Sequence, residues 1–200
     1  MGHQARLSSG DRRQQIVDVA TRLFARQGYE GTTTRQIADS AEVNEAIIFR
    51  HFSTKEDLYW AVIEDQCRMR AGREKLEQAL ASGKDDEEIF TSIASEFLAR
   101  DATLPRLLLF SALERHEVSQ RFFKVHVASY YEILGDYIRR RIEEGAFREV
   151  DPILAARSFF GMLVYHFQVQ ELFGAKHLHD IELEHAVKTF VGIWIKGMRP

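Results

Sequence analysis

Several side chains near the N-terminus are of the types that contact nucleic acid. Arg35 and Arg50 can pair with a phosphate group or donate to O6 and N7 of guanine. Glu45 can accept a hydrogen bond from N4 of cytosine, and Ile47 can pack against the methyl group of thymine. Alternatively, Glu45 is a solvated acid at the start of a helix and Ile47 is a partly exposed apolar residue. Both interpretations stay open, because phosphate contacts outnumber base contacts in protein–DNA interfaces.

The overall charge does not by itself indicate nucleic-acid binding. The chain has 200 residues and a formal net charge of −3 at pH 7. Residues 1–60 contain eight basic and eight acidic side chains, so this segment is neutral. A protein that coats nucleic acid without sequence preference would be far more basic. Any binding must therefore come from the placement of the charges and not from their sum.

Short helices would have to position these side chains. Residues 11–27 carry apolar side chains at helical spacing. Thr33 can cap a helix over residues 34–41, and Asn44 can cap another over residues 45–52. Two short helices joined by a tight turn can cross at a steep angle as a helix-turn-helix, although an ordinary helical hairpin is the alternative. The apolar positions that fit such a crossing are Ile37, Ala38, Ala41, Val43, Ile48 and Phe52.

The rest of the chain is also predicted to be helical. A long helix is expected from Lys55 to Ala81, with Gly72 marking a bend. Further helices are expected over residues 86–100, 104–114, 118–144, 151–173 and 181–197. No segment alternates with the period of a β-strand. The sequence therefore predicts an all-α fold of about nine helices, with a three-helix helix-turn-helix domain over residues 1–54 and a second helical domain over residues 55–200.

The segment from Arg12 to Leu58 resembles the DNA-binding domain of the TetR family of bacterial repressors. This similarity covers about a quarter of the chain and is specific, because many matches occur in order. The matching residues are Ile16, Ala20, Leu23, Phe24, Gly28-Tyr29, Thr33-Thr34, Ile37-Ala38, Ala41-Glu42-Val43, Ile48-Phe49-Arg50-His51-Phe52 and Lys55-Glu56-Asp57-Leu58. The resemblance implies a homodimer that binds double-stranded operator DNA, with residues 55–200 forming a helical ligand-binding and dimerisation domain.

The resemblance also implies roles for individual residues in DNA binding. Thr34 and Arg35 match positions at the start of the second helix that contact phosphate and sometimes a base. The recognition helix is expected to begin after Asn44, and its exposed start is expected to face the major groove with Asn44, Glu45, Ala46 and Ile47. The remaining expected contacts to the DNA backbone or to base edges are Phe49, Arg50, His51 and Lys55.

Three positions depart from the family pattern. Glu42 stands where a glycine is usual in the turn, and a non-glycine residue at positive φ costs roughly 1 kcal/mol. Phe49 stands where a tyrosine is common, so one hydroxyl contact to phosphate is lost. Glu45 would repel a phosphate. An N-terminal arm with Arg6, Arg12 and Arg13 could compensate by reaching phosphates.

Aromatic residues in the C-terminal part indicate two further sites. A pocket for a small apolar or aromatic effector is expected from a mixture of apolar walls and polar groups, with plain core packing as the alternative. The candidate pocket residues are Phe97, Phe110, His126, Tyr130, Phe160, His166 and Phe167. The last two helices are apolar on more than one side, which favours burial against a partner subunit. The candidate interface residues are Phe159, Leu163, Val187, Val191 and Trp194.

Other classes of function find little support in the sequence. The single cysteine, Cys67, excludes an internal disulfide and fits a reducing cytoplasm. No apolar run is long enough to span a membrane, and the N-terminus lacks the apolar segment of a signal peptide. His177, His179 and His185 lie near a predicted loop without the pattern of a metal site, so neither a metal nor a cofactor is expected.

Together these observations predict a ligand-responsive repressor that binds a pseudo-palindromic operator as a dimer in the cytoplasm. In this interpretation the long fourth helix couples the effector to the recognition helices. One alternative is a helical small-molecule-binding or scaffold protein with a weakened DNA face. Another is a helical enzyme, which is disfavoured because no nucleophile–base set is visible and no catalytic residue can be assigned.

Overall fold

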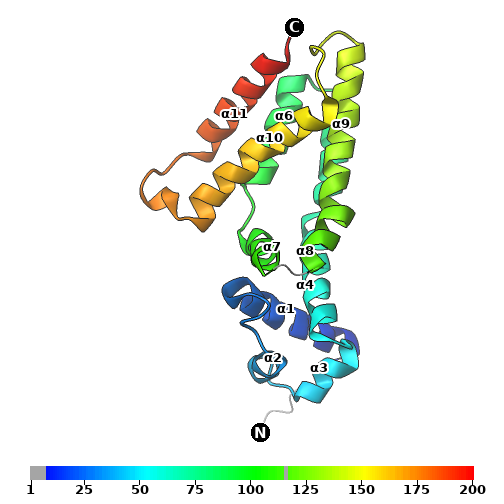
Figure 1. Cartoon of the computed structure of the whole chain (residues 1–200), viewed down its shortest axis with the longest axis vertical. Coiled ribbons are helices and arrows are strands. Elements are labelled where there is room, and N and C mark those ends of the chain that lie inside the picture. The colour runs from blue at the N-terminus through cyan, green and yellow to red at the C-terminus, as the bar shows by residue number, and fades with distance from the viewer. Residues whose placement is uncertain (1–7, 115–116) are drawn as a thin grey trace. The chain divides into compact units, whose positions relative to one another are not determined.

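The computed structural model describes residues 8–114 and 117–200 (Figure 1). Every regular element in this part of the chain is a helix and none is a β-strand, so the predicted all-α fold class is confirmed. Among the described helices, none has the length and apolar character needed to cross a bilayer. The chain divides into two compact units, Met1–Arg70 with Thr103–Arg121 and Ala71–Ala102 with Phe122–Pro200. The functional boundary expected between residues 54 and 55 remains a prediction.

The first unit contains the helices at the N-terminus and two helices from later in the chain. Ser8 caps the first helix by accepting a hydrogen bond from the Asp11 amide, and Gly28 ends it at a φ of 78°. The helices are α1 (Ser9–Gln27), α2 (Thr34–Ser40), α3 (Glu45–His51), α4 (Lys55–Arg70), α7 (Thr103–Leu113) and α8 (Glu117–Phe122), whose last residue belongs to the second unit.

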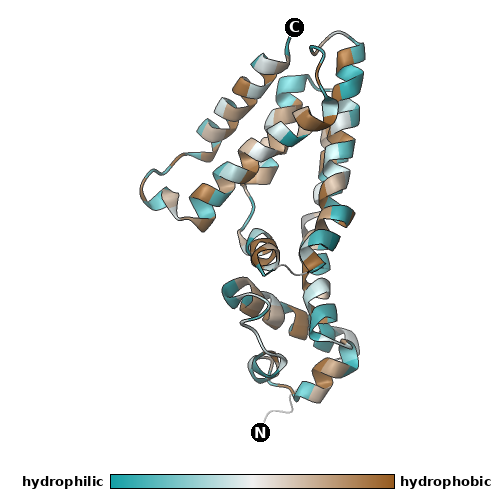
Figure 2. Ribbon diagram, viewed as in Figure 1, coloured by the Kyte–Doolittle hydropathy of each residue, from teal (hydrophilic) through white to brown (hydrophobic). Residues whose placement is uncertain are grey.

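An aromatic cluster joins α1, α4 and α7 in the interior of the first unit. The ring of Phe24 meets that of Tyr59 edge to face at 4.7 Å between centroids, and the ring of Tyr29 lies 5.2 Å from that of Tyr59. The Tyr59 hydroxyl donates to the Leu107 carbonyl at 2.7 Å. Burial raises the pKa of Tyr59, so the hydroxyl keeps its proton as a donor. Helix α7 is rich in apolar residues (Figure 2) and is held against α1 by these contacts.

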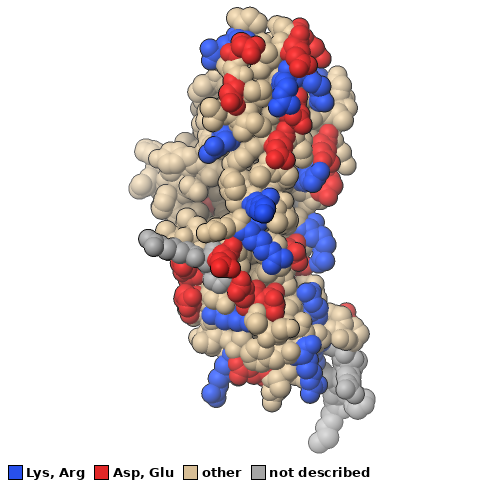
Figure 3. All heavy atoms as spheres, turned by 45° about the vertical axis from the view of Figure 1, so that its right-hand side comes forward, with Lys and Arg blue, Asp and Glu red and all other residues tan. Residues whose placement is uncertain are grey.

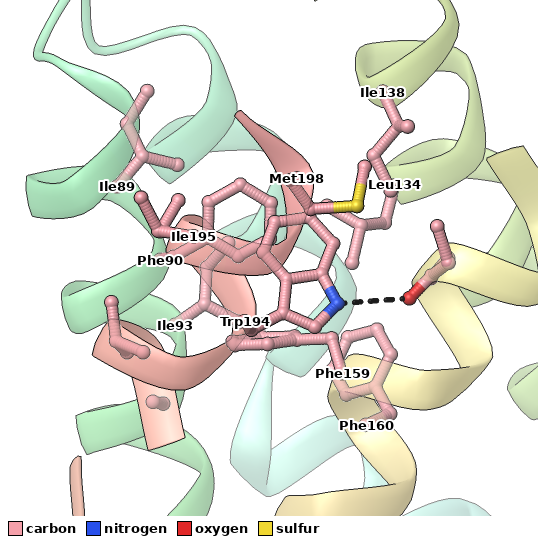
Figure 4. Packing of buried hydrophobic residues seen from close by; sticks show 14 of the residues in the cluster. Ile89, Phe90, Ile93, Leu134, Ile138, Phe159, Phe160, Trp194, Ile195 and Met198 are labelled. Atoms are coloured by element: carbon pink, nitrogen blue, oxygen red, sulfur yellow. Dashed lines mark hydrogen bonds between the residues drawn. The ribbon is translucent and has the colours of Figure 1, made fainter. Parts of the chain in front are cut away.

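The second unit is a separate helical bundle with its own core. Its helices are α5 (Gly72–Leu80), α6 (Asp86–Leu98), α9 (Ala128–Glu143), α10 (Pro152–Phe167) and α11 (Leu183–Met198), with π-helical turns at Phe123–Val127 and Gln168–Leu172 and a short 3₁₀ turn at Ala175–His177. Trp194 stacks on Phe90 at 4.3 Å between centroids and meets Phe159 at 5.5 Å (Figure 4). Its indole N–H donates to the Ala155 carbonyl at 3.3 Å and to the Ser158 hydroxyl at 3.1 Å.

The helix expected from Lys55 to Ala81 is not continuous. It divides into α4 and α5 at Ala71, which adopts a left-handed backbone conformation with φ of 45°. Gly72 follows, and a Cβ added there would lie 2.3 Å from the Tyr130 hydroxyl. Gly72 therefore marks the predicted bend, but the bend is a break in the helix because the backbone of Ala71 leaves the right-handed helical conformation.

The five residues expected at a dimer interface occupy the interior of the protomer. Their relative exposures range from 0 to 6 %, and they are Phe159, Leu163, Val187, Val191 and Trp194. These side chains pack between α6, α9, α10 and α11, so they have no surface left for a partner subunit. The exposed face of the same two terminal helices carries Leu154, Val164 and Tyr165 of α10 and Ile193 of α11.

Candidate functional site

Local side-chain hydrogen bonds fix the start of each helix in the α2–turn–α3 segment. Thr33 and Gln36 form a capping box: the Gln36 amide donates to the Thr33 hydroxyl at 3.1 Å, and the Thr33 amide donates to the Gln36 side chain at 2.9 Å. Asn44 caps α3 by accepting from the Ala46 amide at 2.8 Å. The two predicted caps are present, and each helix ends one residue earlier than expected, which confirms the helix-turn-helix pattern.

The turn between α2 and α3 is held tightly although it contains no glycine. Glu42 has a φ of 53°, the left-handed conformation expected at this position. The Val43 amide donates to the Ala38 carbonyl at 3.0 Å, and the side chain of Gln15 donates to the Ala41 carbonyl at 3.1 Å. Gln15 of α1 thus helps to hold the turn in place while Glu42 keeps its left-handed conformation.

The predicted DNA contacts differ in how they are presented to solvent. Arg35, Asn44, Ala46, Phe49 and Arg50 are exposed, and the Phe49 side chain is 48 % accessible. Two other candidates, Ile47 and His51, are half-buried. On the face seen in Figure 3, Lys and Arg alternate with Asp and Glu and are not sorted into one basic surface. Two exposed arginines on α2 and α3 are therefore the main cationic groups of this segment.

Two of the predicted contacts interact with each other. The Thr34 hydroxyl on α2 donates to the Glu45 carboxylate at the start of α3. This bond links the first turns of the two helices and fixes the orientation of both side chains. The carboxylate is half-buried and already has a donor, so it is less available to a base than the sequence alone implies.

Lys55 lies over an aromatic ring at the start of α4. Its ammonium nitrogen is 4.0 Å from the centroid of the Tyr29 ring. Burial lowers the pKa of Lys55, an effect opposed by the carboxylates of Glu30 and Glu114. The ammonium group of Lys55 is therefore held near the loop that precedes α2. There it can contact a DNA phosphate together with residues of α2.

Glu114 is a functional candidate that the sequence did not reveal. Its carboxylate accepts from the backbone amides of Tyr29 at 3.2 Å and Glu30 at 3.4 Å, so the end of α7 supports the α1–α2 loop. A Cβ at Gly28 would lie 2.5 Å from this carboxylate, which explains a glycine here in addition to its positive φ. Because Glu114 is 85 residues from Tyr29 in the chain, no local sequence signal points to the contact.

The basic residues of the predicted N-terminal arm are engaged with α1 and its surroundings where they are described. Arg12 donates to the side chain of Gln15 at 2.7 Å, and the guanidinium of Arg13 lies 4.8 Å from the centroid of the Phe52 ring. Arg6 lies outside the described residues. The proposed compensation by this arm therefore remains a prediction.

The second unit contains a cavity of about 360 Å³ between α5, α6, α9 and α10. Its lining residues are Gly72, Lys75, Leu76, Gln78, Ala79, Ser92, Ile93, Glu96, Phe97, Arg100, Tyr130 and Phe160. Three predicted pocket residues, Phe97, Tyr130 and Phe160, are among them. The pocket is also lined by Arg100 and Lys75, two cationic residues that were not predicted from the sequence to line it.

The other four predicted pocket residues lie elsewhere. Phe110 belongs to α7 in the first unit and packs near Gly28. His166 lies against the ring of Phe190 at 5.1 Å between centroids, and Phe167 is buried in the core. His126 lies in the π-helical turn before α9. Helical spacing placed all four on helices but could not tell which side of the bundle they face.

Histidines and acidic residues do not converge on a metal site in the described part of the chain. No group of three or more His, Cys, Asp or Glu side chains there is arranged to hold an ion. The histidines singled out in the sequence, His177, His179 and His185, are exposed.

Comparison with known families matches both parts of the chain. The model "Bacterial regulatory proteins, tetR family" matches residues 16–62, which span most of α1 and reach into α4. The model "AefR-like transcriptional repressor, C-terminal domain" matches residues 90–196, more than half of the chain. The chain is thus similar to these regulators over both the helix-turn-helix and the C-terminal helices.

Individual relatives are similar over nearly their whole length. The uncharacterised HTH-type transcriptional regulator YvkB of Bacillus subtilis is 26 % identical over 188 residues, covering 92 % of this chain and 95 % of YvkB. The structure of Bacillus subtilis FadR in complex with stearoyl-CoA has a TM-score of 0.72 at 21 % identity, covering 93 % of this chain and 99 % of FadR. The structure of AibR in complex with isovaleryl coenzyme A and operator DNA has a TM-score of 0.70 at 21 % identity, covering 91 % and 97 %. The two solved structures share the fold with this chain.

Proposed function

The chain belongs to the TetR family of bacterial transcriptional regulators, and from this premise we propose that it is a repressor that binds a pseudo-palindromic operator as a homodimer and responds to a small effector. The observation that carries the proposal is the rigidly capped α2–turn–α3 segment with Arg35 and Arg50 exposed on it. As a member of this family the chain is a DNA-binding regulator and not an enzyme. A regulator of this family acts on DNA, which supports a cytoplasmic location.

Arg35, Arg50 and Lys55 are proposed to bind the DNA backbone, and the exposed start of α3 is proposed to face the major groove. A guanidinium pairs well with phosphate and also with guanine. Direct contacts are assigned to Arg35, Asn44, Ala46, Ile47, Phe49, Arg50, His51 and Lys55. Thr34 and Glu45 also fix α3 against α2 through their mutual hydrogen bond, which uses the proton of the Thr34 hydroxyl and one oxygen of the Glu45 carboxylate and leaves the other oxygen available to DNA.

The dimer is proposed to form through the exposed faces of α10 and α11. Tyr165 and Ile193 are 68 and 59 % exposed, and Gly161, one turn before Tyr165 on α10, has open space around it. Apolar and small residues on adjacent helices let two copies pack closely, and a two-fold axis would present two recognition helices to successive major grooves about 34–36 Å apart.

The effector is proposed to bind in the cavity of the second unit. The volume and the mixture of aromatic walls with a few polar groups are typical of a small-molecule site. FadR and AibR were crystallised with acyl-CoA molecules, which supports an effector with an apolar body. A typical coupling of ~1–3 kcal/mol would change operator affinity by roughly 5–150-fold.

The test is DNA binding by fluorescence anisotropy, first with a randomised pool and then with the selected operator at two salt concentrations. Sequence-selective binding that weakens as salt rises is expected. Arg50→Ala should weaken binding at least ~5-fold and reduce the salt dependence by about one phosphate contact. The matched control is Arg139→Ala, because Arg139 is also exposed but pairs with Asp136 in the second unit.

A second candidate is a helical small-molecule-binding or scaffold protein whose DNA face is weakened. The observations that favour it are the absence of a hydroxyl at the exposed Phe49 and the alternation of acidic with basic side chains on the face seen in Figure 3. A folded dimer that binds no DNA selectively at low salt would support this second candidate and contradict the repressor proposal.

A further inference from the structure

We propose that Glu45 determines one base of the operator: its carboxylate, oriented by the Thr34 hydroxyl, accepts a hydrogen bond from N4 of a cytosine in the major groove. This inference rests on the proposed function, because it takes the exposed start of α3 to face the major groove. It adds the identity of one base in each half-site and makes Thr34 the positioning residue for Glu45.

The backbone around Glu45 has a fixed position relative to α2. Ile48 is 1 % exposed and anchors α3 in the interior of the first unit. The Val43 amide donates to the Ala38 carbonyl at 3.0 Å, which holds the residues before α3 against the last turn of α2. Glu45 therefore projects from a backbone that does not have to be ordered when DNA binds.

The Thr34 hydroxyl fixes the carboxylate in addition to the backbone. It donates its proton to one oxygen of Glu45 across 11 positions of the chain, from the first turn of α2 to the first turn of α3. Both residues are half-buried, which limits the orientations that their side chains can adopt. A side chain that is oriented before binding loses less conformational freedom in the complex. One oxygen is thus engaged by Thr34, and the other stays available to a donor on DNA.

The negative charge of Glu45 restricts the kind of group that it can contact. A carboxylate is repelled by a DNA phosphate, so its partner must be a hydrogen-bond donor on the edge of a base. Arg35 and Arg50 are exposed on the same two helices and can hold the phosphates. Ala46 is exposed and small, so it lets α3 approach the base edges closely. Because Glu45 is a departure from the family pattern, its base preference does not follow from family membership.

The major groove offers a carboxylate two kinds of donor, and they are not equivalent. Cytosine presents its N4 amino group with no acceptor of its own beside it, whereas adenine presents its N6 amino group next to the N7 acceptor. Guanine and thymine present only hydrogen-bond acceptors at this edge, and these repel a carboxylate oxygen. A single acceptor that carries a negative charge therefore selects cytosine over the other three bases.

The test is selection of operators from a randomised pool by the full chain, followed by fluorescence anisotropy with operators that differ at one position. The wild-type protein should select cytosine at one position of each half-site, and any other base there should lower affinity ~5-fold or more. Glu45→Gln should move the preference at this position to adenine, because a side-chain amide can donate to N7 and accept from N6. Glu45→Ala should accept all four bases there within ~3-fold, because it has neither donor nor acceptor.

Three further variants separate the positioning role from a folding defect. Thr34→Val removes the hydroxyl at nearly the same volume and should reduce the discrimination in favour of cytosine ~3-fold or more, whereas Thr34→Ser keeps a hydroxyl and should retain the discrimination. Glu42→Gln is the matched control, because it removes an acidic charge from the exposed turn before α3 and should leave every base preference unchanged. The base preferences at the other positions of the operator report whether each variant still folds.

The outcomes distinguish this inference from the proposed function. Selective binding with the same base preferences in the wild type, Glu45→Gln and Glu45→Ala would overturn the inference and leave the repressor standing. Cytosine discrimination in Thr34→Val equal to that of the wild type would overturn the positioning role of Thr34. A folded wild-type dimer that binds no DNA selectively at low salt would contradict the repressor proposal, and the base assignment would fall with it.

Discussion

Glu42 adopts a backbone conformation that usually belongs to glycine, with a φ of 53° in the turn before the recognition helix. We expect Glu42→Gly to raise the free energy of unfolding of the first unit by about 0.5–1 kcal/mol, because the Cβ clash of the left-handed region disappears. Chemical denaturation followed by circular dichroism measures the change. Glu42→Ala is the matched control, since it removes the same charge but keeps the Cβ. An equal gain in Glu42→Ala would show that charge, and not backbone strain, is responsible.

His166 supplies a pH dependence of stability. Burial against Phe190 lowers its pKa from the ordinary value of 6.5, so the folded protein holds the neutral imidazole more strongly than the unfolded chain. At pH above 6.5 neither state is protonated. As the pH falls below 6.5 the unfolded chain takes up the proton first, so the free energy of unfolding decreases until the folded pKa is passed.

We therefore expect His166→Gln to reduce the loss of Tm between pH 7.5 and pH 5.5, measured by calorimetry. His179→Gln, at an exposed position, is the control and should leave the pH dependence as in the wild type. A pH dependence that is the same in His166→Gln and in the wild type would contradict this assignment.

At the scale of elements, α7 supports the loop that leads into α2. The Glu114 carboxylate accepts hydrogen bonds from two backbone amides of that loop. The side chain of Arg106 donates a hydrogen bond of 3.3 Å to the Ala25 carbonyl near the end of α1. These bonds connect α7 with the segment that positions Lys55 and Arg35. The position of the DNA-binding helices is thus determined in part by a helix far away in the chain.

Glu114→Ala should lower the free energy of unfolding by about 1 kcal/mol and weaken operator binding, because two loop amides lose their acceptor. Denaturant titration and fluorescence anisotropy measure the two effects. Glu114→Gln keeps a side-chain oxygen as acceptor and should therefore lose less stability and less operator affinity than Glu114→Ala. Glu132→Ala, at an exposed position of α9, is the control and should change neither quantity. Operator binding as strong in Glu114→Ala as in the wild type would mean that the loop does not depend on α7.

At the scale of the whole molecule, the proposed operator binding requires a dimer. If the exposed faces of α10 and α11 form the dimer interface, Ile193→Asp should place a charge in an apolar contact and dissociate the dimer. Analytical ultracentrifugation should then show a monomer, and operator affinity should fall at least ~10-fold because only one half-site is held at a time.

Met69→Asp is the control for this change, because Met69 of α4 is also exposed and apolar but belongs to the first unit. It should leave the dimer intact. A dimer that persists in Ile193→Asp at low micromolar concentration would place the interface on another surface.

The sequence by itself determined the features that arise from short-range interactions. Helical periodicity gave the all-α fold, and the side-chain caps Thr33 and Asn44 marked the starts of α2 and α3 at the correct residues. Gly28 and the strained position of Glu42 were also visible, because turn conformations depend on one or two residues. Ordered matches from Arg12 to Leu58 were sufficient to indicate the family.

Only the tertiary structure decided which surfaces meet. An apolar stripe shows that one side of a helix is buried but not which surface covers it. Trp194 and Phe159 were for this reason expected between subunits, whereas they pack against each other within the core of one protomer. The contact of Glu114 with the α1–α2 loop and the convergence of Arg100 with Tyr130 join residues distant in the chain, and no local pattern encodes them. The physical reason is that periodicity and capping act within a few residues. Pockets, and contacts between residues distant in the chain, depend on how whole helices pack together.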